Sequence, residues 1–166
     1  RVLICKRTPF IKEELDGLRA GLAGISSLDF LTIEYEPAWR FLACITKDQQ
    51  IQSAPFPVRR GTGVLLDEES FYLWLHGSVE RINSAGKTYY QGKTRIPAPV
   101  RVRRYGGSST IEQLAQDLLG LSKMDWNTFD LYEQMPAHVT TPGRIARIGR
   151  LLQRLAPECF DYRLFM

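Results

Sequence analysis

Residues 91–102 read QGKTRIPAPVRV, and this stretch decides the fold class. A polar turn that carries Lys93 and Arg95 leads through two prolines into an alternation of apolar and basic residues at 100–103. Alternation with a period of two is typical of a strand with one face in water. The pair Gly106-Gly107 then ends the strand, because glycine interrupts regular structure.

Two helices are predicted after this strand. Ser109 and Glu112 have the spacing of a capping box, and apolar residues at helical spacing continue to about Leu121. Thr141-Pro142 is a second start signal, an N-cap followed by proline at the first helical position, and it predicts a helix to about Leu155. The second helix carries Arg144, Arg147 and Arg150. Cationic groups around an α/β unit are typical of proteins that hold a phosphate backbone.

The first half of the chain also mixes strands with a helix. Val2–Cys5 is a short apolar run of the buried-strand kind, and Ile11–Leu22 places leucines at helical spacing between charges. Further strands are predicted at residues 30–33, 40–46, 64–66 and 71–75. The first two of these are expected to form a hairpin around Pro37. Turns and exposed connectors are predicted at residues 47–50, 54–63 and 78–87. Together these segments indicate an α/β fold.

Composition indicates one globular core. The chain has 166 residues, of which 44% are hydrophobic and 24% charged. No run approaches the roughly 18 apolar residues that span a bilayer, and the start is too short for a secretory signal, so a soluble, cytoplasmic protein without membrane contact is expected. Three distant cysteines, Cys5, Cys44 and Cys159, argue against a disulfide framework or a zinc cluster and are expected to be core thiols.

The net charge of +4 is unevenly spread. Residues 1–83 carry 10 Lys and Arg against 11 Asp and Glu, whereas residues 84–166 carry 12 against 7. The basic character therefore belongs to the second half. A basic face is more often a solvated surface than a binding site. Charge by itself therefore makes nucleic-acid binding the less common of the two explanations.

The order of these segments carries a resemblance. The turn at 91–95, the Pro-x-Pro strand, the segment 121–127 that ends the first helix, and Met135-Pro136 before the last helix resemble the C-terminal half of the PIWI domain of Argonaute proteins. Arg1–Ile4 and the helix after it are similar to that domain's middle strand and helix. The Lys-Met-x-Trp-Asn form of 123–127 is most similar to prokaryotic members.

The resemblance implies an RNase H-like fold, a mixed sheet flanked by helices. With a neighbouring MID domain, such a fold holds a short 5′-phosphorylated guide strand and presents it to a complementary DNA target. The MID domain and the first part of PIWI precede this segment in the family. Residues 1–166 are therefore expected to be the C-terminal part of a PIWI domain, present as a fragment, a split subunit or a piece of a larger protein.

Catalysis in active members uses four mostly acidic ligands for two divalent ions, because both the attacking and leaving oxygens of a phosphodiester need stabilisation. The third position falls in Lys6-Arg7-Thr8, at about Arg7, and the fourth falls at about Gly143. Neither side chain ligates a metal, so the resemblance implies the catalytically inactive branch, without a catalytic metal. A shifted alignment would instead use Asp16 or Asp29, although Asp16 lies on the polar side of a helix, where a solvated carboxylate is expected.

The resemblance also implies which residues contact the guide. The phosphate-binding residues would be Gln91, Lys93, Thr94, Arg95, Lys123, Asn127 and Arg150. The terminal carboxylate of Met166 would lie near the 5′-phosphate, with Mg²⁺ as the implied ion. Trp126 is expected to be a core or stacking anchor. His76, at a strand end, and His138 are expected to be structural, with a guide phosphate as the alternative partner of His76.

Three functional hypotheses remain open. The first is a nuclease-inactive segment that binds guide and guide-target duplex in prokaryotic defence, with an effector protein as a further partner. The second is an active nuclease with unrecognised ligands, and the third is a protein-assembly module whose basic face is solvated. The sequence leaves open whether the guide is RNA or DNA, because that choice depends on sugar contacts.

Overall fold

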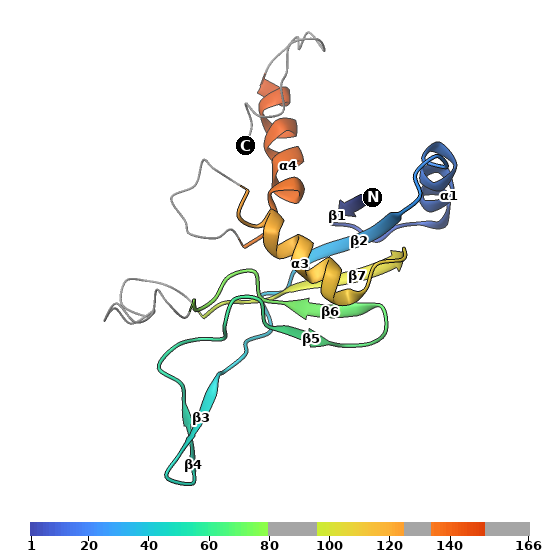
Figure 1. The fold of residues 1–166 in the computed structure, drawn as a ribbon. Coiled ribbons are helices and arrows are strands. Elements are labelled where there is room, and N and C mark those ends of the chain that lie inside the picture. Colours follow the sequence, from blue (N-terminus) through green and yellow to red (C-terminus); the bar gives the residue numbers. More distant parts are fainter. Residues whose placement is uncertain (80–95, 125–133, 152–166) are drawn as a thin grey trace.

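The computed structural model describes residues 1–79, 96–124 and 134–151. Their regular elements, in chain order, are β1 (Val2–Lys6), α1 (Lys12–Gly21), β2 (Leu28–Tyr35), β3 (Cys44–Lys47), β4 (Gln50–Ser53), β5 (Gly63–Leu65), β6 (Ser70–Leu73), β7 (Val100–Gly106), α3 (Ile111–Leu121) and α4 (Ala137–Leu151). Figure 1 shows a twisted sheet with α3 across it and the β3–β4 hairpin projecting away. The predicted α/β class, a mixed sheet flanked by helices, is confirmed.

The main sheet has the strand order β1-β2-β7-β6-β5. β1 and β2 are parallel, and the other neighbours are antiparallel. β2 lies between β1 and β7, and its residues 29–33 are buried on both faces. The predicted hairpin of 30–33 with 40–46 is therefore wrong, because β2 takes strands distant in sequence as its partners.

The hairpin forms one strand later, between β3 and β4. The predicted polar turn at 47–50 is confirmed, and Asp48 and Gln49 at its tip have φ values of 51° and 62°. Positive φ at both central positions matches the twist of a tight two-residue hairpin turn. Both strands of the hairpin are exposed throughout.

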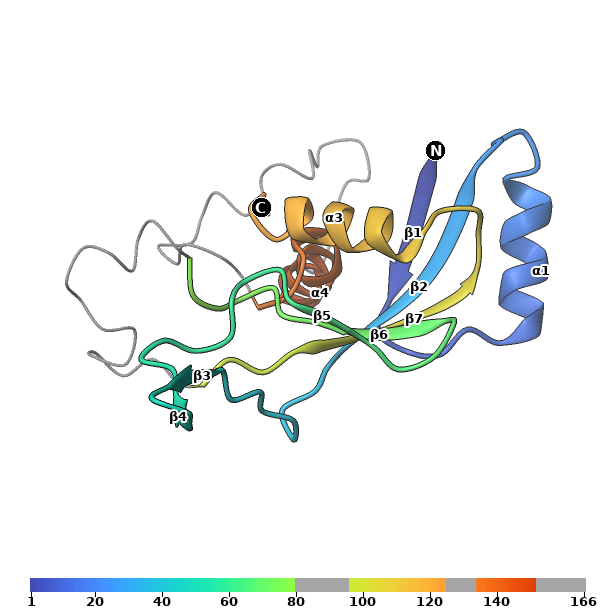
Figure 2. The same ribbon diagram turned by 60° about the horizontal axis from the view of Figure 1, so that its bottom comes forward.

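The hydrophobic core lies between the sheet and α3. Alternate residues of three adjacent strands point into it, namely Leu31, Ile33, Phe71, Leu73, Val100 and Val102. Leu114 and Leu118, four residues apart on α3, complete the layer from the other side and are fully buried. Val139 of α4 packs against the same core, so α3 and α4 share one side of the sheet (Figure 2).

α3 begins one residue later than the sequence predicted. The N-cap is Thr110, whose hydroxyl accepts the N–H of Gln113 at 3.2 Å, while the Gln113 side chain accepts the N–H of Thr110 at 3.0 Å. Ser109 was the predicted cap, but it lies inside and donates to Asp29 from its N–H at 3.1 Å and from its hydroxyl at 2.6 Å. A buried carboxylate therefore recruits the serine that the local pattern assigned to the helix.

α4 begins one turn earlier than predicted, at Ala137. The carbonyl of Pro136 accepts the N–H groups of Val139 at 2.9 Å and Thr140 at 3.3 Å, which starts the helix before the expected Thr141-Pro142 signal. Thr141 is buried rather than capping, and Pro142 lies inside the helix. A proline in the second turn removes one helical N–H, a cost that packing of the helix against the core offsets.

The connector before β5 is only partly exposed, contrary to the prediction for 54–63. Val58 is buried, and its carbonyl accepts the N–H of Ser78 at 3.0 Å. Gly77 lies so close to this connector that a Cβ there would be 2.5 Å from the Val58 oxygen and 2.8 Å from the Arg60 nitrogen. Glycine at 77 lets the two segments approach. The predicted loop at 78–87 lies mostly outside the described residues.

The three cysteines, all predicted to be core thiols, have different outcomes. Cys5 is half-buried in β1 beside the core, and burial raises the pKa of its thiol to about 12. Cys44 is exposed on the hairpin, so its assignment to the core is wrong. Cys159 lies outside the described residues. In the part of the chain that the structure describes, no helix is both long and apolar enough to cross a membrane.

Candidate nucleic-acid interface

Most of the predicted guide contacts lie outside the described residues, namely Gln91, Lys93, Thr94, Arg95, Asn127 and Met166, as does Trp126. Lys123 is exposed directly after α3, and Arg150 is exposed near the end of α4. The start of α4 lies beside the end of α3, because Leu121 and Ala137 line one cavity. Arg150 follows thirteen residues along the helix, roughly 20 Å away. The structure therefore does not bring these two cations together.

The two positions assigned to metal ligands are both exposed. Arg7 follows β1, and Gly143 lies in α4, where a Cβ would meet nothing within 4 Å. Lys6, beside Arg7, forms an ion pair with Glu14 of α1. Among the residues that the structure describes, no group of three His, Cys, Asp or Glu side chains is placed to hold a metal ion.

The two alternative carboxylates have other surroundings. Asp16 is exposed on α1, as predicted, 4.0 Å from Arg19. Asp29 is buried and accepts hydrogen bonds from Ser109 and from Arg1 Nε at 3.1 Å. Burial opposes ionisation of Asp29, but the hydrogen bonds from Ser109 and Arg1 outweigh it and lower the pKa. Asp29 is therefore an ionised structural group.

The two histidines differ in their surroundings. His76 is half-buried just beyond β6, and its side chain is not without an interaction partner. Neither ring nitrogen of His138 has a hydrogen-bond partner, and burial lowers the pKa of the imidazole. His138 lines an apolar cavity of about 330 Å³ between the end of α3 and the start of α4, together with Leu121, Met124 and Ile145.

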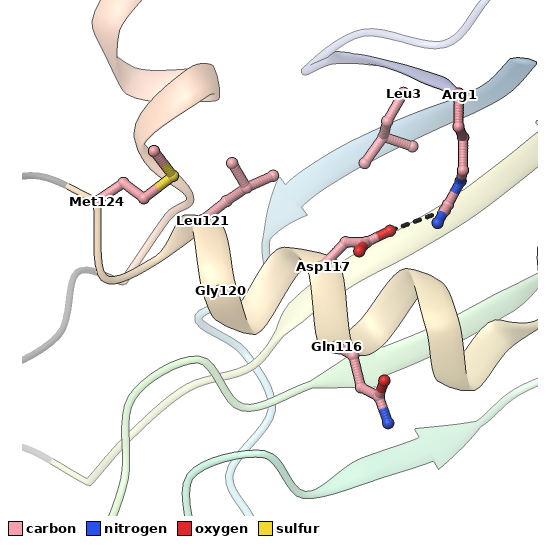
Figure 3. Close-up of a pocket in the computed structure, with 7 residues that line it drawn as sticks. All are labelled: Arg1, Leu3, Gln116, Asp117, Gly120, Leu121 and Met124. Carbon is pink, nitrogen blue, oxygen red and sulfur yellow. Dashed lines mark ion pairs between the residues drawn. The ribbon is translucent and has the colours of Figure 1, made fainter.

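A second cavity, of about 430 Å³, lies between β1 and α3 (Figure 3). Leu3 and Leu121 line it, and an ion pair between Arg1 and Asp117, at 2.7 Å, stands at its side. Arg1 also binds Asp29, so its guanidinium is committed to carboxylates of the protein itself. This cavity is therefore a poor site for phosphate.

Basic residues gather on the other face of the sheet. Side chains alternate between the two faces of a strand, so the neighbours of the core residues point away from α3. We call this surface the open face, and its members are Thr32, Glu34, Ser70, Tyr72, Arg101 and Arg103. Arg101 and Arg103 are exposed on it, whereas Thr32 and Ser70 are buried. α1 lies at one end of the sheet (Figure 2). Phe10, just before α1, packs on Phe30 and Tyr105 of the sheet.

Two exposed arginines occupy the middle of the open face. In the strand register Arg101 stands between Glu34 and Tyr72, and Arg103 stands between Thr32 and Ser70. The Arg103 guanidinium also lies 5.5 Å from the ring centroid of Tyr105. The two exposed arginines therefore follow each other on one face of β7, and Arg103 has an aromatic ring beside its guanidinium.

Two carboxylates partly offset the positive charge of the open face. Glu34 stands opposite Arg101, and Asp67 accepts a hydrogen bond from the Ser70 hydroxyl at 2.6 Å. That bond, a backbone hydrogen bond from Glu69 and the nearby Arg103 all lower the pKa of Asp67. The arginines therefore have acidic groups nearby, and the surface is not a uniformly basic patch.

A short segment after β2 borders the open face with aromatic rings. Trp39 lies 6.0 Å from Tyr72 between ring centroids, and Phe41 lies 5.5 Å from Trp74 in an edge-on contact. Arg40, between them, donates to the carbonyls of Pro37 and Trp39. Trp74 is buried, with its indole N–H donated to Pro97, whereas Trp39 remains 58% exposed.

Sequence reasoning missed this surface as a candidate site. The alternation at 100–103 predicted a wet strand face, and that prediction is confirmed. Nothing local, however, placed Trp39 beside β6 or showed that no helix among the described residues covers the middle of this face. Guanidinium groups suit phosphate oxygens, and aromatic rings suit base faces, so the open face combines two chemistries that nucleic acids use.

No protein-family model matches the sequence, and no curated protein matches it. Among solved structures, the chain is similar to Clostridium butyricum Argonaute bound to a guide DNA and a 19-mer target DNA, with a TM-score of 0.64, 13% identity, and coverage of 98% of this chain and 19% of that one.

Two further solved structures are similar. The first is Aa-Ago with externally bound siRNA, with a TM-score of 0.62, 19% identity, and coverage of 92% of this chain and 18% of that one. The second is Aquifex aeolicus Argonaute, with a TM-score of 0.52, 16% identity, and coverage of 93% and 18%. The chain spans less than a fifth of the length of each of these proteins. At these identities the likeness concerns the backbone, and it shows that the chain has an Argonaute-like fold.

Proposed function

We propose that this chain is a nucleic-acid-binding part of an Argonaute-like protein, which holds a short 5′-phosphorylated guide and the guide-target duplex by the sugar-phosphate backbone. The observation that carries the proposal is the pair Arg101 and Arg103, exposed in succession on β7, on the face of the sheet that points away from α3. Contacts to phosphates position a strand without reading its sequence, so two neighbouring exposed guanidinium groups suit this task.

The predicted guide contacts extend this proposal. Gln91, Lys93, Thr94, Arg95 and Asn127 would supply donors beside Lys123 and Arg150. Because Lys123 and Arg150 are separated by most of α4, each would contact a different part of the bound strand.

The proposal further holds that the chain binds without cutting. A two-metal mechanism needs oxygen or nitrogen ligands around both ions. Arg7 repels a cation and Gly143 has no ligand atom, so neither position contributes one. Cleavage would then belong to an effector protein, and the biological setting would be prokaryotic defence against invading nucleic acid.

The test measures binding and cleavage in one preparation. Fluorescence anisotropy of the chain with 5′-phosphorylated and 5′-hydroxyl single strands, DNA and RNA, would be recorded across a salt series. Replacing both Arg101 and Arg103 by alanine should weaken binding and reduce the salt slope by about 0.7 for each lost phosphate contact. Lys47→Ala, which removes an exposed cation from β3 of the projecting hairpin, is the matched control and should leave the slope unchanged.

Each alternative has its own outcome. Cleavage of a matched target in Mg²⁺ or Mn²⁺ would establish an active nuclease with unrecognised ligands. Absence of binding to every strand and to the duplex would leave the protein-assembly module as the remaining hypothesis. An unchanged salt slope in the double variant would remove the open face from the site, even if the chain binds.

A further inference from the structure

Trp39 is an unusual residue to leave in water. Its side chain is 58% exposed although it is the largest apolar side chain in its segment. The ring is also held in position from below, because it rests on Tyr72 with a centroid separation of 6.0 Å. An aromatic ring that is both exposed and fixed has already lost most of the conformational freedom that binding would remove.

The backbone that carries Trp39 is fixed as well. The Arg40 guanidinium donates to the carbonyls of Pro37 and Trp39, at 2.8 Å for the latter. Two residues beyond Trp39, Phe41 packs edge-on against buried Trp74. Contacts on either side of Trp39 therefore hold the backbone of this segment, while the indole itself stays largely exposed.

Two arginines of β7 lie next to Tyr72, the residue that Trp39 contacts. Tyr72, beneath Trp39, stands opposite Arg101 in the strand register, and Arg103 follows two residues along β7. The two arginines are therefore separated by roughly 7 Å along the strand. Trp39 and the arginines form a row in which a base would meet the ring while phosphates meet the guanidinium groups.

A duplex cannot use such a row fully. In a helix each base is stacked between its neighbours, and only its edges reach the grooves, whereas unpaired bases expose their faces to aromatic side chains. We infer that Trp39 stacks with an unpaired base and that the open face therefore prefers single-stranded nucleic acid. This inference rests on the proposed function and specifies its substrate class.

The experiment compares three probes of equal length by fluorescence anisotropy on the full chain. They are oligothymidine, an abasic strand with the same phosphates, and a blunt duplex. Wild type should bind oligothymidine most tightly. Trp39→Leu should weaken oligothymidine binding by about 5- to 100-fold and leave abasic binding unchanged, because stacking and not charge is lost.

Two variants control for folding and for loss of apolar surface. Trp39→Phe keeps an aromatic ring and should retain most of the affinity. Ile51→Ala removes a side chain that is 79% exposed on β4 and should leave all three affinities unchanged. Equal unfolding midpoints in urea would show that Trp39→Leu remains folded.

The outcomes separate the inference from the proposed function. If wild type binds the abasic strand or the duplex as tightly as oligothymidine, or if Trp39→Leu binds oligothymidine as wild type does, the stacking inference fails while backbone binding stands. If no probe binds, the proposed function fails and the inference fails with it.

Discussion

Asp29 offers the sharpest test of what holds this fold together. Its carboxylate is fully buried and accepts the N–H and hydroxyl of Ser109 and the Nε–H of Arg1. Asp29→Ala would leave two buried donors of Ser109 without an acceptor, at about 1–3 kcal/mol each. The expected loss is about 2–6 kcal/mol of unfolding free energy, or a Tm lower by roughly 4–24 °C for a chain of this size.

The dependence of the unfolding free energy on pH in the acid range gives a second test of the role of Asp29. Because the folded-state pKa of Asp29 is lowered, its ionised form stabilises the fold above the unfolded-state pKa of about 3.9. That stabilisation is lost as the pH falls through the lower, folded-state pKa. Asp29→Asn should therefore reduce stability near neutral pH and flatten its decline below about pH 4.

The assay is urea unfolding followed by far-UV circular dichroism, first near neutral pH and then down a series to about pH 3. Asp16→Ala, which removes an exposed carboxylate from α1, is the matched control and should leave the midpoint almost unchanged. The reasoning is refuted if Asp29→Ala unfolds at the wild-type urea concentration, or if Asp16→Ala costs as much.

Three further changes probe separate parts of the fold. Gly77→Ala would place a Cβ 2.5 Å from a backbone oxygen and should cost about 1–3 kcal/mol in urea unfolding. His138→Leu should raise stability by about 1 kcal/mol, because it removes two ring nitrogens without partners beside an apolar cavity, and a lower urea midpoint would contradict this. In a Cys159→Ser background, Ellman's reagent should label Cys44 quickly and Cys5 only on unfolding, since burial keeps the Cys5 thiol protonated; rapid labelling of two thiols would contradict this.

Local patterns predicted the elements better than their partners. The strand at Val2–Cys5, the helix after it and the alternating strand at 100–103 were confirmed because each carries its own periodicity. The hairpin around Pro37 was wrong because β2 is buried on both faces and takes β1 and β7 as neighbours. Pairing over such distances leaves no local signal in the sequence.

Helix starts failed for a related reason. Ser109 and Thr110 are both good caps, and only the buried carboxylate of Asp29 decides that the first faces inward. At the second helix the predicted Thr141-Pro142 start is overridden, because Pro136 begins the helix one turn earlier and Thr141 is buried. Tertiary contacts outweigh a capping preference of about 1 kcal/mol.

The candidate site was predictable only in part. The wet face of residues 100–103 could be read from the alternation, and with it the exposure of Arg101 and Arg103. The aromatic border could not, because Trp39 reaches Tyr72 only through the sheet order. The predicted guide contacts at 91–95 stay predictions, since they lie outside the described residues.

The placement of β7 beside β2 also has a consequence for synthesis on the ribosome. Tyr35 of β2 pairs with Val100, so β2 waits for a partner made about 65 residues later. At roughly 5–20 residues per second, that interval lasts some 3–13 seconds. Throughout it, the apolar run from Phe30 to Ile33 leaves the exit tunnel with one edge unpaired, which makes the nascent first half a natural client for chaperones.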